Sequence, residues 1–116
     1  MVNAQNSYSR PEAALSMLRT VLYAQGFHFF MPDGHYTSKT EMSLHSFLID
    51  MKSIDTQSIK FHFDRGDFQK WLRTTIGDED LALIIGKLDE KIPEENLGEK
   101  LADIVQKRIS ELQLTY

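Results

Sequence analysis

The sequence predicts a mainly α, compact single-domain protein of five or six short helices around one core, with a short β-hairpin near residues 27–37. Apolar residues recur at helical spacing along most of the chain. Capping residues and glycines separate these segments. A chain of 116 residues that is 41% hydrophobic is the size of one ordinary domain. Residues 1–8 lack apolar periodicity, so we expect a flexible tail followed by one helical domain over 9–116.

The first helix is expected to begin near Ser9, which has capping-box spacing with Glu12, and to end at Gly26. Its apolar face would consist of Leu15, Leu18 and Leu22. Beyond it, Phe27, Phe29 and Met31 alternate with other residues, and the segment "PDG" at 32–34 is typical of a turn. This pattern indicates a hairpin, although a packed aromatic loop would share it.

Further helices follow with recognisable start signals. The segment "SKTE" at 38–41 resembles a second capping box, and Asp55, Asp67 and Asp78 are suitable N-caps for the next three helices. The expected inward residues are Leu44, Phe47, Leu48, Met51, Ile59, Phe63, Phe68, Trp71, Leu72, Ile76, Leu81, Ile84, Ile85 and Leu88. Gly66 and Gly77 would end helices in a left-handed conformation.

The last helix begins near Pro93. Glu94 and Glu95 lie at its positive end, and Lys107 and Arg108 lie toward its negative end, as the helix dipole favours. Its expected buried residues are Leu97, Leu101, Ile104, Val105, Ile109 and Leu112.

Charge and composition argue against several classes of function. Residues 1–76 carry 8 basic and 7 acidic side chains, whereas residues 77–116 carry 5 basic and 10 acidic ones. The acidic C-terminal third would repel a polyanion, so we expect no nucleic-acid partner. The chain has no cysteine, and therefore no disulfide or thiolate metal site. No stretch approaches the ~20 apolar residues that span a bilayer, so we expect a cytoplasmic protein without a membrane partner.

One segment resembles a known family. The run from "SLHSF" at 43–47 through "FHFDRGDFQKWL" at 61–72 to "GDEDLA" at 77–82, with the upstream "FHFFMPDGHYTSKT", is similar to the prokaryotic family catalogued as domain of unknown function 5752. The resemblance covers roughly residues 27–85. The residues that carry it are Gly34, Ser43, Leu44, Phe47, Ser58, Ile59, His62, Arg65, Gly66, Asp67, Phe68, Trp71, Gly77, Asp78, Leu81 and Ala82. The resemblance implies a family but no activity.

The segment "FHFDRGDF" at 61–68 has a structural and a catalytic interpretation. In the structural one, which we favour, Gly66 ends one helix, Asp67 caps the next, and His62 donates a hydrogen bond to a carbonyl or to Asp67. Trp71 then fills the core with its N–H bonded to a carbonyl. In the catalytic one, Asp67 orients His62 as a general base, but the sequence indicates no nucleophile to complete the site.

Ligand sites have weaker support in the sequence. Lys60, Arg65, Lys70 and Arg73, with Trp71 beside them, are candidates for binding an anion, although Asp64 and Asp67 offset these charges. Neither the set His62, Asp64 and Asp67 nor the pair His28 and His35 has the spacing of a complete metal site. We therefore predict no metal and no cofactor.

The aromatic segment suggests an interaction surface. Phe29, Phe30 and Tyr36 are candidates for contacting a partner protein or a second copy of the chain, because aromatic residues are enriched at interfaces. The hypothesis that the sequence favours is an interaction or regulatory module rather than an enzyme. The alternative is a small enzyme or anionic-ligand-binding domain that uses His62, Arg65 and Asp67.

Overall fold

The computed structural model describes residues 11–114, which form a mainly α domain with one two-stranded antiparallel sheet. Residues 11–17 are helical. The elements that follow are a 3-10 turn η1 (Tyr23–Gln25), strands β1 (Phe27–Phe30) and β2 (Tyr36–Glu41), helices α2 (Leu44–Asp50), α3 (Thr56–Arg65) and α4 (Asp67–Trp71), a π-helical segment η2 (Leu72–Ile76), and helices α5 (Glu79–Gly86) and α6 (Glu94–Gln113).

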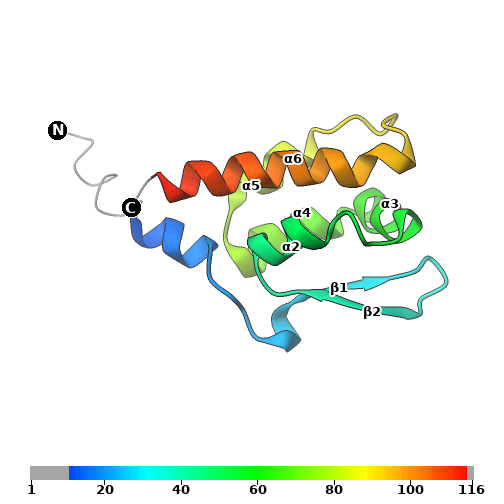
Figure 1. Ribbon diagram of the computed structural model, residues 1–116, viewed down its shortest axis with the longest axis horizontal. Helices are drawn as coiled ribbons and strands as arrows, with labels where there is room; N and C mark the ends of the chain where they lie inside the picture. The colour runs from blue at the N-terminus through cyan, green and yellow to red at the C-terminus, as the bar shows by residue number, and fades with distance from the viewer. Residues whose placement is uncertain (1–10, 115–116) are drawn as a thin grey trace.

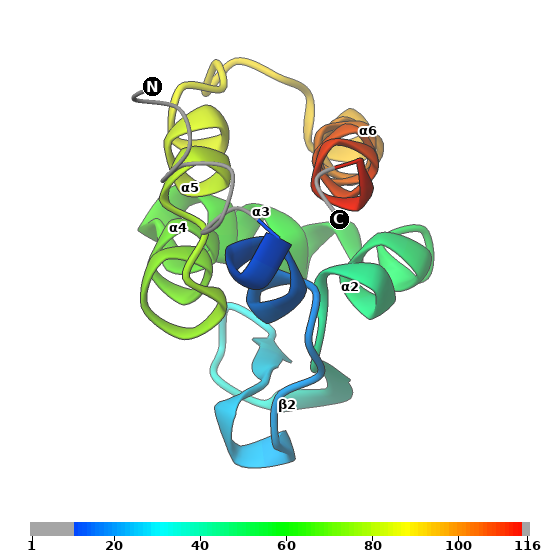
Figure 2. The ribbon, with the colours of Figure 1, turned by 90° about the vertical axis from the view of Figure 1, so that its left-hand side faces the viewer.

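Helices α2, α3 and α4 lie between the hairpin and the long helix α6. Figure 1 shows α6 along one side of the domain and the hairpin along the opposite side. In the perpendicular view, α5 lies beside α4, and α6 packs next to α2 (Figure 2). A two-stranded ribbon is only marginally stable alone, and here the helices cover one of its faces.

The predicted hairpin is present, and β2 extends further than expected. Phe27 pairs with Glu41, His28 with Thr40, and Phe30 with Tyr36, with an irregularity between His28 and Phe30. The prediction that "SKTE" at 38–41 opens a helix is therefore wrong, because these residues form hydrogen bonds with β1 instead. Ser38 is left-handed, with φ of 69°, at the irregular part of β2.

Short-range capping explains where several helices begin. Ser43 caps α2 by accepting a hydrogen bond from the Ser46 N–H, so the cap lies five residues after Ser38. Asp55 caps α3 through the Gln57 N–H, and Asp78 caps α5 through the Leu81 N–H, both as predicted. Pro93 precedes α6, also as predicted.

The corner between α3 and α4 is made by Gly66 in the left-handed conformation, with φ of 76°. Gly66 itself occupies the N-cap position of α4, and Asp67 is the first residue of that helix. The prediction that Asp67 is an N-cap is therefore wrong, and its carboxylate has other partners. Gly77, with φ of 86°, ends η2, where the N–H groups of Gly77 and Asp78 both donate to the Leu72 carbonyl.

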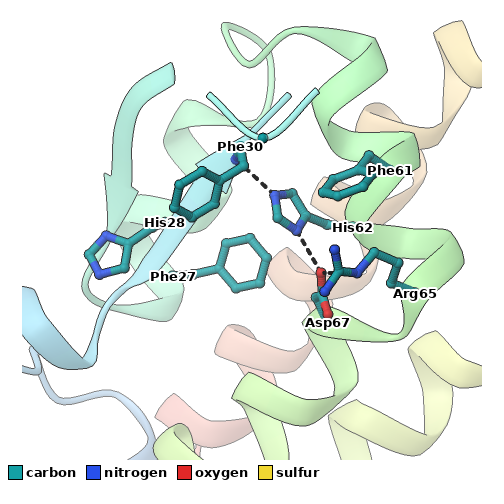
Figure 3. A pocket seen from close by; sticks show the side chains of 8 residues that line it. Phe27, His28, Phe30, Phe61, His62, Arg65 and Asp67 are labelled. Carbon is teal, nitrogen blue, oxygen red and sulfur yellow. Dashed lines mark hydrogen bonds and ion pairs between the residues drawn. The ribbon is translucent and has the colours of Figure 1, made fainter. Parts of the chain in front are cut away.

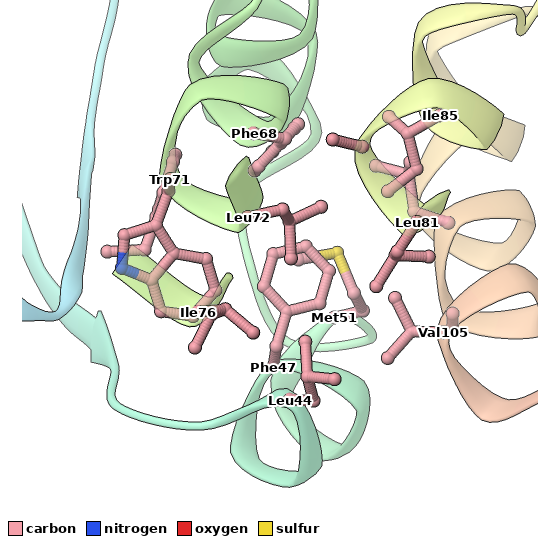
Figure 4. Close-up of a cluster of buried hydrophobic side chains, with 14 of the residues drawn as sticks. Leu44, Phe47, Met51, Phe68, Trp71, Leu72, Ile76, Leu81, Ile85 and Val105 are labelled. Carbon is pink, nitrogen blue, oxygen red and sulfur yellow. The ribbon is translucent and has the colours of Figure 1, made fainter. Parts of the chain in front are cut away.

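The core is a continuous cluster of aliphatic and aromatic side chains from every layer. Figure 4 shows Phe47 and Leu44 of α2 facing Phe68, Trp71 and the residues of η2, with α5 and α6 closing the other side. Predicted core residues that are buried include Leu44, Phe47, Met51, Ile59, Phe63, Phe68, Trp71, Leu72, Ile76, Leu81, Ile85, Leu97, Leu101, Val105, Ile109 and Leu112. Ile84 was expected inside but is exposed.

The first helix departs most from expectation. Helical structure ends near residue 17 instead of at Gly26, and Leu15 and Leu22 are exposed. Ala14 and Val21 are buried instead. Arg19 donates to the carbonyls of Thr75 and Ile76, and this tertiary contact ties the segment to the end of η2. The predicted cap Ser9 and the predicted tail at 1–8 lie outside the described residues.

Candidate functional site

A pocket of about 310 Å³ lies where the hairpin meets the end of α3. Its walls come from the hairpin, from α3 and from the first residue of α4, and most of its lining surface is apolar. The lining residues are Phe27, His28, Phe30, Gly34, Phe61, His62, Arg65 and Asp67. Figure 3 shows His62 at the centre of this group, between Phe30 on one side and Asp67 on the other.

Both ring nitrogens of His62 are engaged. Nε2 accepts a hydrogen bond from the Phe30 backbone N–H at 2.9 Å, so this nitrogen carries a lone pair and no proton. Nδ1 therefore bears the proton and donates to Asp67 Oδ2 at 2.8 Å. The side chain is 5% exposed. His62 is thus held in the Nδ1-protonated tautomer by two partners from different elements.

The backbone of Phe30 is also bound on its carbonyl side. Ser58, which lies one helical turn before His62, donates its hydroxyl proton to the Phe30 carbonyl at 2.8 Å. His62 and Ser58 therefore satisfy the backbone N–H and the backbone carbonyl of Phe30. A strand edge with unpaired N–H and C=O groups can recruit another strand, and these two side chains prevent that at Phe30.

Asp67 connects the corner to the pocket rim. Its Oδ2 accepts from His62 and lies 3.4 Å from Arg65 Nε. The Arg65 side chain is 60% exposed, and its Cζ lies 4.8 Å from the centroid of the Phe61 ring. Within residues 11–114 the terminal nitrogens of Arg65 form no hydrogen bond, so they remain available at the rim.

This geometry limits the chemistry of the pocket. A general base needs a free lone pair within reach of a substrate proton, and the only lone pair of the His62 ring is already bound to Phe30. The Ser58 hydroxyl is buried and directed at the same residue, so it is not placed as a nucleophile. What the pocket does offer is aromatic surface with one guanidinium group at its edge, which suits binding of an apolar group that has an anionic or carbonyl neighbour.

The other predicted ligand-binding residues lie elsewhere. The Trp71 ring is buried in the core and donates to the Gln25 carbonyl at 2.9 Å, as the structural interpretation predicted. Arg73 pairs with Glu79. Lys60 pairs with Asp64 along α3, and none of these residues lines the pocket of Arg65. Of the predicted anion-binding residues, Arg65 is the one that lines this pocket.

The predicted interaction residues differ in how exposed they are. Phe29 is fully buried, so the prediction that it lies on an exposed surface is wrong. Phe30 is partly buried and lines the pocket, whereas Tyr36 is exposed and packs beside His28 and Tyr23 on the outer face of the hairpin. Alternation along β1 separates Phe29 from Phe30, since neighbouring side chains point to opposite faces. Phe30 and Tyr36 are partners across the hairpin, and their ring centroids lie 5.6 Å apart, so these two share a face.

The histidines considered as metal ligands have separate partners. His28 Nδ1 hydrogen-bonds to Thr40, and His35 Nδ1 bonds to Asp33. In the part of the chain that the structure describes, no group of three or more acidic or histidine side chains is arranged to hold a metal ion.

Sequence reasoning did not identify Phe27 and Phe61 as pocket walls. It also treated Ser58 only as an unconvincing nucleophile. One feature of the sequence could have indicated the role of these side chains. Ser58 and His62 are polar residues four positions apart on the apolar face of α3, where buried polar groups need partners. That signal predicts a bonded pair but does not name Phe30, which is 28 and 32 residues away in the sequence.

Comparisons of the chain with protein-family models, curated proteins and solved structures found no match. The resemblance to the family of domain of unknown function 5752 therefore stays a prediction. Of the residues that carry this resemblance, Gly34, His62, Arg65 and Asp67 line one pocket. Among the described helices, none is long and apolar enough to cross a membrane.

Proposed function

We propose that this domain is an interaction module whose pocket between the hairpin and α3 receives one apolar side chain of a partner protein, next to an acidic residue of that partner. The proposal rests on which groups around the pocket already bond within the domain and which are accessible to a partner. The polar atoms of His62 are used inside the domain, whereas the partly exposed rings of Phe30 and Phe61 and the outer edge of Arg65 remain accessible.

The size of the pocket supports a side chain over a large cofactor. Small-molecule sites generally enclose roughly 300 to 1,000 Å³, and this pocket, at about 310 Å³, is at the lower limit and open to solvent. Aromatic and arginine residues around a pocket are also the groups that contribute most to binding at protein interfaces.

The apolar walls and the guanidinium can be tested with a fragment. We expect 3-phenylpropionate, added at millimolar concentration, to shift the backbone amide NMR signals of Phe30, Gly34, Phe61 and Arg65. The cation 3-phenylpropylamine has the same ring without the carboxylate, and its binding should be weaker. Equal shifts with both compounds, or shifts at another surface, would contradict the assigned role of Arg65.

A peptide-display selection tests the partner class. Random 12-residue peptides selected on the domain should share an aromatic or large aliphatic residue beside Asp or Glu. Arg65→Ala should weaken their binding on the order of tenfold. The matched control is Arg73→Ala, which removes an exposed arginine paired with Glu79 and away from the pocket. Selected peptides that bind Arg65→Ala and wild type equally would exclude this pocket as the docking site.

A further inference from the structure

Glu41 is the most unusual ionisable residue in the described chain. It is the last residue of β2, two positions before the N-cap of α2, and its side chain is fully buried. Among residues 11–114, neither carboxyl oxygen of Glu41 has a hydrogen-bond partner. A buried carboxylate in that condition would be expensive, whereas a protonated carboxyl in the same place costs far less.

The neighbours of Glu41 do not supply the missing donors. The Ser46 hydroxyl is the nearby neutral donor, but its proton is directed to the Ser43 carbonyl at 3.3 Å, and it accepts from the Met42 N–H. Lys39, on the same strand, is exposed. The acidic side chain close to Glu41 is Asp50 of α2, and a like charge there opposes ionisation.

These surroundings change the pKa of the Glu41 carboxyl group. Burial raises the pKa of Glu41 to about 7, and Asp50 acts in the same direction, while Ser46 and Lys39 act in the opposite one. Two histidines lie on elements next to Glu41. His28 of β1 bonds to Thr40 on β2, and His45 of α2 is exposed. The Glu41 carboxyl must therefore be observed directly.

The backbone around Glu41 forms the connection between the hairpin and the helices. The Val21 N–H donates to the Met42 carbonyl at 2.8 Å. Gly26 packs so closely that a Cβ there would lie 2.9 Å from the Glu41 carbonyl oxygen. Opposite Glu41, Phe27 places its ring in the core. If Glu41 were ionised, its carboxylate could reach water only if these contacts separated.

We propose that the protonated side chain of Glu41 is a latch that keeps the β2–α2 junction closed, and that loss of its proton opens the junction locally. The latch acts at residues 39–43 and leaves the opposite end of the hairpin, where Phe30 is bound by His62 and Ser58, in place. The inference does not depend on what occupies the pocket.

The sign of the pH effect follows from the raised pKa. A group whose pKa is higher in the folded protein contributes stability that is complete below the unfolded value, 4.5, and is lost as pH rises to about 7. Between pH 5 and pH 8 the folding equilibrium constant should therefore decrease on the order of 100-fold.

The first test is the titration of wild-type protein, with the Glu41 side-chain carboxyl carbon followed by NMR. We expect a midpoint close to 7, and a midpoint near 4.5 would overturn the proposal. In parallel, urea unfolding from pH 5 to 8 compares wild type with Glu41→Gln, which keeps the shape and cannot ionise. The decrease should vanish in Glu41→Gln and persist in Glu99→Gln, an exposed control on α6. Equal pH profiles for wild type and Glu41→Gln would also overturn it.

The second test asks whether opening is local. Amide hydrogen exchange, corrected for intrinsic rates, should show protection of the Val21 and Met42 amides decreasing as pH rises from 5 to 8. Protection at these two amides should stay below that of Val105, in the middle of α6, because the junction opens without global unfolding. If Val21 and Met42 match Val105 at every pH, the junction opens only when the whole domain unfolds, and there is no latch.

Discussion

His62 of α3 accepts a hydrogen bond from the backbone N–H of Phe30 in β1, at 2.9 Å, and so joins two segments 32 residues apart. Because a backbone N–H can only donate, this contact determines which nitrogen of the ring is unprotonated. Asp67, on the other side of the ring, accepts the proton that remains on Nδ1. One side chain therefore holds the hairpin to α3 and α3 to the start of α4.

The tautomer of His62 is directly testable. We expect long-range 1H–15N NMR correlations to show Nδ1 protonated and Nε2 unprotonated in the folded protein at neutral pH. The exposed ring of His45 provides an internal reference. A protonated Nε2 on His62 would contradict the hydrogen bond that this nitrogen accepts from the Phe30 N–H.

Removal of the His62 ring should destabilise the domain. His62→Ala leaves the Phe30 N–H and the Asp67 carboxylate without this partner and creates a cavity among the rings of Phe27 and Phe29. We expect a loss of about 2 to 4 kcal/mol in the free energy of unfolding, measured with urea. His45→Ala is the control and should change stability by less than about 0.5 kcal/mol. Equal effects of the two substitutions would mean that the His62 contacts contribute little.

Two of the arginine–acid pairs, Arg108–Asp78 and Arg73–Glu79, should differ in their contribution to stability because their burial differs. Arg108 makes two hydrogen bonds to Asp78, which is fully buried and also caps α5. Arg108→Ala leaves a buried carboxylate without its counterion, and we expect a cost of about 3 to 5 kcal/mol. Arg73→Ala breaks an exposed pair with Glu79, which should cost less than about 1 kcal/mol. Comparable losses from the two variants would show that the Asp78 charge is stabilised by other groups.

Two glycines should resist substitution for different reasons. Gly66 has φ of 76°, and an added Cβ would meet no atom of residues 11–114 within 4 Å, so Gly66→Ala should cost about 1 kcal/mol from backbone strain alone. Gly26 has an ordinary φ of −72°, but an added Cβ would lie 2.7 Å from the Thr40 methyl and 2.9 Å from the Glu41 carbonyl. We expect Gly26→Ala to cost more than Gly66→Ala in thermal unfolding. The opposite order would mean that the hairpin can move away from Gly26 easily.

Features that depend on neighbours within about four residues could be predicted from the sequence alone. Asp55 and Asp78 cap helices by bonding to N–H groups two and three positions ahead, and Gly66 and Gly77 end helices where a positive φ is needed. The apolar spacing of α6 likewise predicted its buried face, because a helix of 20 residues repeats the pattern often enough to be unambiguous.

Tertiary structure decided the features that need a distant partner. "SKTE" has the letters of a capping box, yet pairing with β1 places Ser38 and Glu41 in a strand, since a strand ladder satisfies more backbone groups than one cap. Asp67 is a residue type that commonly caps helices, but it is the first residue of α4, after the cap position at Gly66, and its carboxylate contacts His62 and Arg65. By residue type, Glu41 is expected on the surface, and it becomes buried only when the hairpin packs on the helices. Local hydrogen bonds are encoded in adjacent residues, whereas burial and side-chain partners across 28 to 32 residues depend on how the whole chain packs.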